Sequence, residues 1–311
     1  MPQNRKRRLP LVRESEASGR TLEIYQEIKT ALGVPHVNLV FQAYGAQPRF
    51  LDVMWRSWRP VLEAGEFFRE ADRLRAEAYT RVHNYFLVPD LGAKIREIQF
   101  TPGAQHELAE VVELFHYNNP PLLLIAAGQL QAFEDDGAHA HRAQAPAEHP
   151  VFAEKPVKVT ENDAPAPIRR IYDEMKRVLG VPFINTDYQA LARFPDYLNL
   201  YWESMKPVVL SPLYVETQRA MRESALALAG ELPDAPQLSL ERIQEAGLQY
   251  EEISAAIRVT EDFLELLSGL VLNIAFAKIS IEGGNQRQSP DRRPPQPELA
   301  GREENPPERA A

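Results

Sequence analysis

The chain repeats one of its own phrases after an interval of 147 residues, and this repeat restricts the possible folds more than any other feature. Residues 32–41 read LGVPHVNLVF, and residues 179–188 read LGVPFINTDY. At the same offset, residues 24–61 match residues 171–208 at 17 of 38 positions without a gap. The repeat is far longer than a solenoid unit. We therefore expect an internal duplication whose two halves pack as a pseudo-dimer.

Apolar residues recur at helical spacing, which predicts an all-α protein. Ile24, Ile28 and Leu32 mark one face of a helix that should end at Gly33. Strand-like alternation is scarce, and residues 151–159 are the one extended candidate. Further helices are expected at 38–44, from 48 onward, and at 65–86, 108–133 and 250–281. The Pro120-Pro121 pair should kink or split the 108–133 helix.

Changes in composition divide the chain into five segments. We predict a disordered N-terminal tail (1–17), a first helical repeat (18–133), a linker rich in Ala, Pro and His (134–160), a second helical repeat (161–281) and a disordered tail rich in Pro, Arg and Glu (282–311).

Composition also excludes several classes of function. The chain has no cysteine, which rules out disulfides, zinc–thiolate sites and cysteine nucleophiles. No uncharged apolar run is long enough to span a membrane, and no signal peptide follows the basic residues 5–8, so a cytoplasmic protein is expected. With a net charge of −9, we expect no nucleic-acid partner. Glu113 and His116 have di-iron spacing but no second copy, so no metal is expected.

The two copies of the phrase differ where a carboxylate appears. Asp187 stands where the first copy has Val40, and Thr186 stands where it has Leu39. An acid in the first turn of a helix is often stabilised only by the helix dipole, and spacing alone favours that reading. The alternative is a general base at the seam between the halves. The apolar Val40 at the equivalent position favours this alternative, because it indicates that Asp187 is buried. Buried acids usually have a function.

Other candidates also have two readings. Asn185 has Asn38 as its equivalent, and an Asn kept in both copies is more simply a helix cap than a ligand contact. Asn119 precedes two prolines, so it marks a structural bend or an amide aimed at a ligand or a water. Phe41 and Tyr44 share a helix face and could be core residues or walls of the seam.

The two phrases, together with the segment FHYNNP at 115–120, resemble the group I 2-haloacid dehalogenases, the halocarboxylic acid dehydrogenase DehI family. The resemblance covers about residues 20–282. It implies an all-α fused pseudo-dimer that associates as a homodimer and needs no cofactor. It also implies hydrolysis of short 2-halo acids to 2-hydroxy acids, with inversion at C2, by a water that an Asp activates directly.

By position, the resemblance assigns the catalytic Asp to Asp187 and the Asn that holds the water to Asn119. It places further pocket residues at Phe41, Tyr44, Asn185, Thr186 and Leu122, where Leu122 replaces a Tyr of the family and Asn185 fits a preference for D substrates. The substrate is then a small anionic 2-halo acid, whose carboxylate is expected on N–H groups at the start of the second-copy helix. The alternative is a non-catalytic helical pseudo-dimer that binds a small carboxylate or a protein partner.

Overall fold

The computed structural model describes residues 9–98, 100–134, 149–232, 236 and 238–285, and this part of the chain is all-α, as predicted. It contains no strand, and residues 151–159 form an irregular segment. The helices are α1 (Gly19–Leu32), α2 (Leu39–Gly45), α3 (Pro48–Glu63), α4 (Gly65–Tyr85), α5 (Leu91–Glu97), α6 (Pro102–Glu134), α7 (Ala166–Leu179), α8 (Thr186–Leu191), α9 (Pro195–Val209), α10 (Pro212–Glu231), α11 (Leu240–Glu245) and α12 (Tyr250–Ile281).

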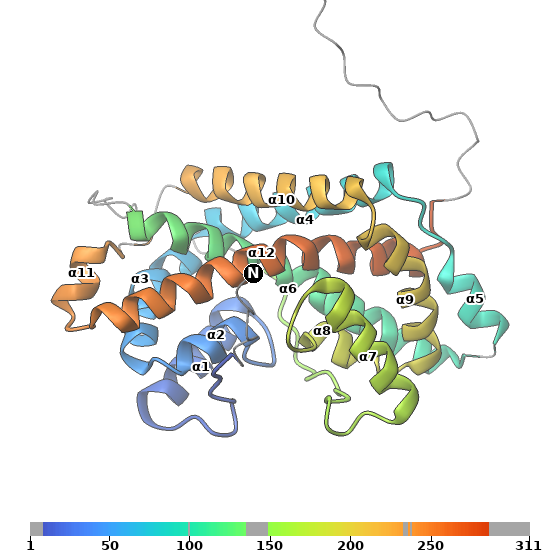
Figure 1. The fold of residues 1–311 in the computed structure, drawn as a ribbon, viewed down its shortest axis with the longest axis horizontal. Helices are drawn as coiled ribbons and strands as arrows, with labels where there is room; N and C mark the ends of the chain where they lie inside the picture. The colour runs from blue at the N-terminus through green and yellow to red at the C-terminus, as the bar shows by residue number, and fades with distance from the viewer. Residues whose placement is uncertain (1–8, 99, 135–148, 233–235, 237, 286–311) are drawn as a thin grey trace, which may run out of the picture.

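Two long helices, α6 and α12, form the centre of the molecule (Figure 1). Every residue of α6 from Leu114 to Gln129 is buried, and so is every residue of α12 from Leu267 to Ala277. A helix that is buried on all sides is a core helix. α12 has the length and hydropathy of a membrane span, but 78% of that stretch is buried inside the protein.

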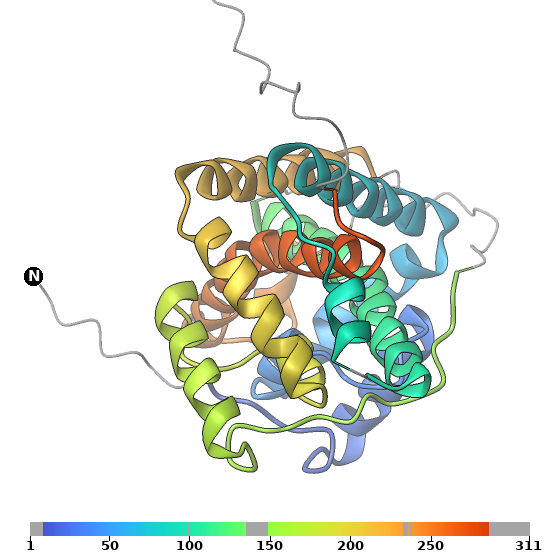
Figure 2. The same ribbon diagram turned by 90° about the vertical axis from the view of Figure 1, so that its right-hand side faces the viewer.

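The remaining helices surround this pair in two similar groups. α1, α2 and α3 lie on one side of the centre, and α7, α8 and α9 lie on the other (Figure 1). α4 and α10 run side by side across the top, as Figures 1 and 2 both show. α5, from the N-terminal part of the chain, packs against α9 on the far side. Helices from the N-terminal and C-terminal parts of the chain therefore pack among each other.

Several local contacts recur 147 residues apart. Tyrosine hydroxyls donate to carbonyls, indole N–H groups donate to carboxylates, and lysines pair with glutamates at matching positions. The pairs are Tyr25–Val12 (2.9 Å) and Tyr172–Val159 (2.8 Å), Trp55–Glu27 (2.7 Å) and Trp202–Glu174 (2.8 Å), and Lys29–Glu14 and Lys176–Glu161 (both 2.6 Å). These contacts support the predicted duplication, which stays a prediction.

The glycines of the repeated phrase end helices, as predicted. Gly33 follows α1 with φ 65°, and Gly180 follows α7 with φ 70°. Glycine adopts this left-handed conformation without the steric cost that a Cβ brings.

One of the two alternatives for the proline pair was wrong. The prolines at 120 and 121 do not split α6, which continues for 33 residues, and a kink stays a prediction. Each proline removes one backbone hydrogen bond, and the surrounding core holds the helix together. Part of the predicted N-terminal tail is also ordered, because the Val12 N–H donates to the Gln42 carbonyl at 2.9 Å.

The segments predicted as linker and C-terminal tail are also partly attached to the fold. The Phe152 N–H donates to the Gly33 carbonyl, and Asn285 donates to the carbonyls of His83 and Phe86. These hydrogen bonds satisfy backbone groups that would otherwise be left unpaired at the ends of helices. The rest of these predictions concerns residues 1–8, 135–148 and 286–311, which lie outside the described residues.

Candidate active site

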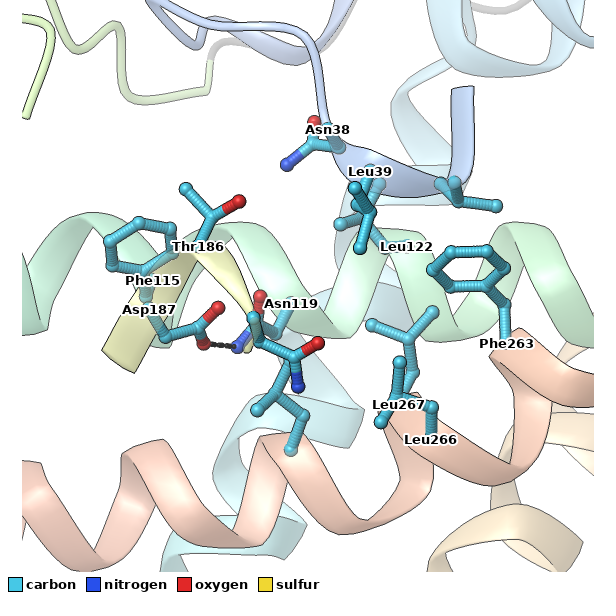
Figure 3. Close-up of a pocket in the computed structure, with 13 residues that line it drawn as sticks. Asn38, Leu39, Phe115, Asn119, Leu122, Thr186, Asp187, Phe263, Leu266 and Leu267 are labelled. Atoms are coloured by element: carbon cyan, nitrogen blue, oxygen red, sulfur yellow. Dashed lines mark hydrogen bonds between the residues drawn. The ribbon is translucent and has the colours of Figure 1, made fainter. Parts of the chain in front are cut away.

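A small cavity lies where the N-terminal ends of α2 and α8 meet the sides of α6 and α12 (Figure 3). Its volume, measured as the space open to the centre of a water-sized sphere, is about 30 Å³. A single water needs about 10–15 Å³ by this measure, so the cavity has room for water. It is lined by Asn38, Leu39, Val40, Phe115, Asn119, Leu122, Asn185, Thr186, Asp187, Phe263, Leu266, Leu267 and Leu270.

Asp187 and Asn119 form a buried pair on one side of this cavity. Asp187 lies in the first turn of α8 and is 4% exposed, and Asn119 lies in the middle of α6 and is 2% exposed. The Asn119 Nδ2 donates to Asp187 Oδ2 at 2.7 Å (Figure 3). The two candidates, which are distant in the sequence, are therefore in direct contact. Their hydrogen bond links the two predicted repeats.

Burial changes the acidity of this carboxyl group. Desolvation raises the pKa of Asp187 from 3.8 to about 6, because the charged form loses its water. The hydrogen bonds from Asn119 and from the Asp187 backbone N–H act in the opposite direction and stabilise the charge. A carboxylate with a pKa near 6 is ionised at neutral pH and is a stronger base than an exposed Asp.

The opposite side of the cavity is apolar at the matching positions. The residues that lie 147 positions from Asp187, Thr186 and Asn119 are Val40, Leu39 and Leu266, and all three line the cavity. In Figure 3, Leu39, Leu122 and Phe263 lie on the side away from the Asp187 carboxylate. The cavity therefore has a polar side that carries the acid and an apolar side that does not.

The two asparagines that precede α2 and α8 were predicted to be helix caps, and this was wrong for their side chains. Asn38 and Asn185 occupy the N-cap positions, but neither side chain makes a capping hydrogen bond. They are 5% and 4% exposed, and both line the cavity. An Asn at this position usually accepts a hydrogen bond from the first turn. Here both amides are left available to the cavity.

Of the other predicted pocket residues, Thr186 and Leu122 line the cavity, whereas Phe41 and Tyr44 are absent from its lining. Phe41 is buried in the core. The Tyr44 hydroxyl is paired with the Thr260 hydroxyl at 2.7 Å, so Tyr44 joins α2 to α12. α2 presents its first two residues, Leu39 and Val40, to the cavity, and these two aromatics come after them.

Sequence reasoning missed most of the apolar wall. Phe115, Phe263, Leu267 and Leu270 line the cavity from α6 and α12. α6 from Leu114 to Gln129 and α12 from Leu267 to Ala277 are buried on all faces, so periodicity there does not reveal which side borders a cavity.

A buried amide behind the acid holds α8 against α12. Asn273 donates from Nδ2 to the Tyr188 hydroxyl at 2.8 Å, and its Oδ1 accepts from the Tyr214 hydroxyl at 2.7 Å. The Asn273 carbonyl accepts from Tyr201 at 3.0 Å. Because Tyr188 directly follows Asp187, this network fixes the helix turn that carries the acid.

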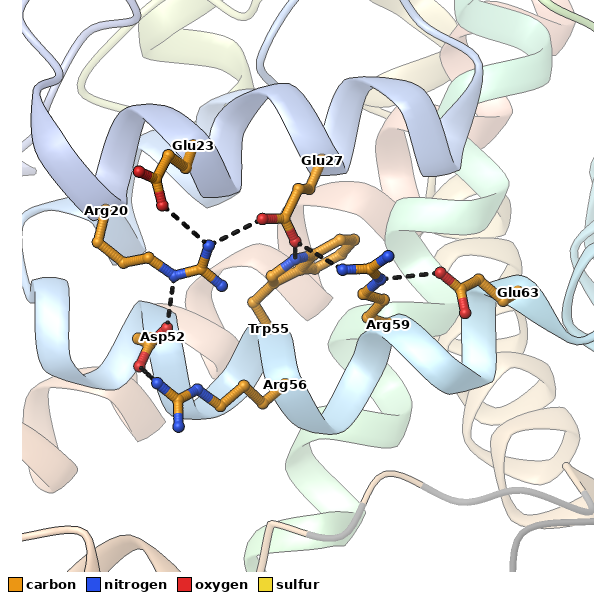
Figure 4. A network of polar contacts seen from close by, with 8 residues as sticks. All are labelled: Arg20, Glu23, Glu27, Asp52, Trp55, Arg56, Arg59 and Glu63. Atoms are coloured by element: carbon orange, nitrogen blue, oxygen red, sulfur yellow. Dashed lines mark hydrogen bonds and ion pairs between the residues drawn. The ribbon is translucent and has the colours of Figure 1, made fainter.

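On the other side, an exposed network joins α1 to α3, the helices that flank α2 (Figure 4). Glu27 accepts from the Trp55 indole at 2.7 Å and from Arg20 and Arg59 at 2.8 and 3.2 Å. Arg20 also reaches Asp52 at 2.9 Å. Exposed ion pairs contribute little individually, so the indole contact is the more important of these for position.

Basic groups and clustered metal ligands are absent from the described lining of the cavity. The Glu113 carboxylate of the apparent di-iron spacing pairs with Lys278 at 2.7 Å. The chemistry of the cavity therefore depends on one carboxylate, three amides and one hydroxyl within an apolar surround.

Comparisons with known proteins identify the family of the chain. The family model described as halocarboxylic acid dehydrogenase DehI matches residues 35–183. The chain is 30% identical to an (R)-2-haloacid dehalogenase of Pseudomonas putida, over 86% of this chain and 91% of that protein. It is 24% identical to a configuration-inverting 2-haloacid dehalogenase of Alcaligenes xylosoxydans xylosoxydans, over 81% of this chain and 83% of that protein.

A solved structure gives the same result. The complex structure of a D-2-haloacid dehalogenase with L-LA matches with a TM-score of 0.82 and 29% identity, over 88% of this chain and 96% of that one. The chain is thus an all-α hydrolase that acts on carbon–halide bonds. It belongs to the halocarboxylic acid dehydrogenase DehI family.

Proposed function

We propose that the cavity is the active site for hydrolysis of short 2-haloalkanoic acids, and that Asp187 activates the attacking water. The observation that carries this proposal is the buried Asp187–Asn119 pair, 2.7 Å apart, beside a cavity with room for water. A general base must reach its proton at hydrogen-bond distance or through one water, and this arrangement allows it.

The residues divide the reaction between them. Asn119 uses its Nδ2 on the Asp187 carboxylate, which leaves its Oδ1 to accept a hydrogen bond from the water. The water oxygen attacks C2 as the carbon–halogen bond breaks, and the halide leaves on the opposite face with the bonding electron pair. The water proton passes to Asp187 and then to solvent. The products are a 2-hydroxy acid of inverted configuration, a halide ion and a proton.

The apolar side of the cavity has two roles in this proposal. Leu122, Leu266 and Phe263 contact the alkyl group of the substrate and keep bulk water away from the reacting atoms. A dry surround strengthens electrostatic interactions and keeps the base poorly solvated and reactive. Thr186 and Asn185 complete the polar side, and Asn185 limits the space beside the acid in a way that fits D substrates.

The names of the relatives support this stereochemistry. One relative is named for the (R) substrate, and another is named as configuration-inverting. We therefore propose that this chain converts D-2-chloropropionate to L-lactate. A cytoplasmic location, a homodimer and the division of the chain into two helical repeats remain predictions.

The decisive experiment measures free halide after incubation with D- and L-2-chloropropionate, together with the chirality of the lactate formed. A single turnover in H₂¹⁸O distinguishes direct attack by water from an ester on the enzyme. Direct attack places ¹⁸O in the first lactate, whereas an ester intermediate places the label in the protein carboxylate. Release of halide by the wild type that persists undiminished in Asp187→Asn would refute the role of this residue.

A further inference from the structure

The described lining of the cavity has no cationic side chain to bind the carboxylate of an anionic substrate. The proposed function, on which this inference rests, requires a carboxylate to enter a site whose described lining contains no Lys, Arg or His. Burying a carboxylate without hydrogen-bond donors is costly. The donors must therefore be neutral side chains or backbone groups.

Asn38 has the properties of such a donor. It is 5% exposed, lines the cavity and makes no capping hydrogen bond. No hydrogen bond joins its side chain to another described residue, so its Nδ2 donor is free to bind a ligand, and its enclosed Oδ1, which only accepts, is not the atom that would meet an anion. A buried amide donor without a partner in the protein needs an explanation, and an acceptor on a ligand is one. In Figure 3 the amide of Asn38 and the hydroxyl of Thr186 point toward each other, above the Asp187–Asn119 pair.

We propose that the Asn38 amide N–H binds the substrate carboxylate, with the Thr186 hydroxyl donating to the second carboxylate oxygen. A carboxylate held there places C2 between the water at Asp187 and the apolar side formed by Leu39 and Leu122. The first half of the chain, which lacks the acid, then contributes the group that orients the substrate.

A neutral amide suits this position better than a cation. A Lys or Arg beside Asp187 would stabilise its charged form and make it a weaker base. An amide donates to the substrate carboxylate without weakening Asp187 as a base, although it attracts the carboxylate less strongly than a cation would. Hydrogen bonds to charged groups are still about twice as strong as those between neutral groups.

Two variants separate substrate binding from a structural role. Asn38→Asp keeps the size of the side chain and its ability to cap a helix, but it loses the donor and repels an anion. Asn38→Ser also retains a capping group but is too short to reach the substrate. Gln47→Ala is the matched control, because Gln47 is the N-cap of α3, makes no capping bond, has a buried unpartnered Oε1 and lies outside the cavity lining.

The probe is propionate, which carries the carboxylate but has no halogen to release. Its dissociation constant is measured by calorimetry at pH 8, beside KM and kcat for D-2-chloropropionate and the melting temperature. We expect both Asn38 variants to melt near the wild type and to weaken propionate binding by about tenfold to a hundredfold, with a matching rise in KM. Asn38→Asp should have the larger effect, and Gln47→Ala should have none.

Unchanged propionate binding and KM in both variants would overturn the assignment. So would a change in inhibition by bromide alone, because the amide would then hold the departing halide and not the carboxylate. Since propionate binding needs no turnover, this result is independent of the dehalogenation assay. Halide release that persists with unchanged propionate binding refutes only the role of Asn38, and propionate binding that depends on Asn38 without halide release refutes only the proposed reaction.

Discussion

Replacing Asp187 by Asn should abolish most of the activity and make the protein more stable. The pKa of the carboxyl group is about 6 in the folded protein and 3.8 when unperturbed. The folded state therefore binds the proton more tightly than the unfolded state does. Above pH 6, keeping the ionised group folded costs the difference of about 2 pKa units, which is about 3 kcal/mol. The Asn side chain has no such charge and can still accept the hydrogen bond from Asn119.

The stability gained by the variant should depend on pH in a definite direction. The stability gained in Asp187→Asn should be fully present above pH 6, should shrink as the pH falls through 6 toward 3.8, and should vanish below 3.8, where the wild-type carboxyl is protonated in both states. For a chain of this size, 3 kcal/mol corresponds to a rise in melting temperature of roughly 5 °C or more. Loss of a general base should lower kcat by about 10²–10⁴-fold.

The assay is thermal unfolding of the wild type and the variant between pH 4 and 8, beside halide release at pH 8. Asp196→Asn is the control, because Asp196 also lies in the first turn of a helix in the same half but is exposed. The control should retain its activity and show no gain in stability. If Asp187→Asn is less stable than the wild type at pH 8, burial of the ionised carboxylate does not lower the free energy of unfolding. The reasoning about its raised pKa is then wrong.

Further outcomes follow from the same site. The kcat/KM of the wild type should rise with pH through about 6 and then level off, as a pH profile would show, because the base must be ionised. Asn119→Ala removes a hydrogen bond that lowers the pKa of Asp187, so the acidic limb of this profile should move to higher pH and the plateau should fall. Asn273→Leu leaves two tyrosine hydroxyls without their amide partner and should cost about 1–3 kcal/mol in thermal unfolding, with a lower kcat. Leu122→Ala should enlarge the apolar side, cost about 2–5 kcal/mol, and raise kcat/KM for 2-bromohexanoate relative to 2-bromopropionate.

The helical fold was predictable because its signals are local. Apolar spacing marked α1 and α4, and the glycines after the repeated helices marked their ends. The short helix α5 was missed, since seven residues carry too little periodicity to separate a helix from a turn. The prolines of α6 left both a kink and a split open, because local sequence does not show how strongly a core holds a helix together, and the split does not occur.

The residues of the cavity could be singled out from the sequence only where the two copies differ. Asp187 stood out against Val40, and Asn119 stood out as an amide before two prolines; the structure brings both to one cavity, and their catalytic roles stay predictions. Asn38 was taken for a helix cap because the N-cap position and the cavity wall coincide at that residue. Which face of a helix that is buried on all sides borders a cavity is decided by its neighbours, and a single sequence does not record this.

The pairing of an α6 amide with an α8 acid has a consequence for how folding of this protein should be monitored. Both helices can form in a collapsed, loosely packed chain, and circular dichroism would then report a normal helical signal. The 2.7 Å contact exists only when the N-terminal and C-terminal parts have docked in the correct register. Regain of halide release during refolding is therefore a measure of that final docking step, and it should lag behind the recovery of ellipticity.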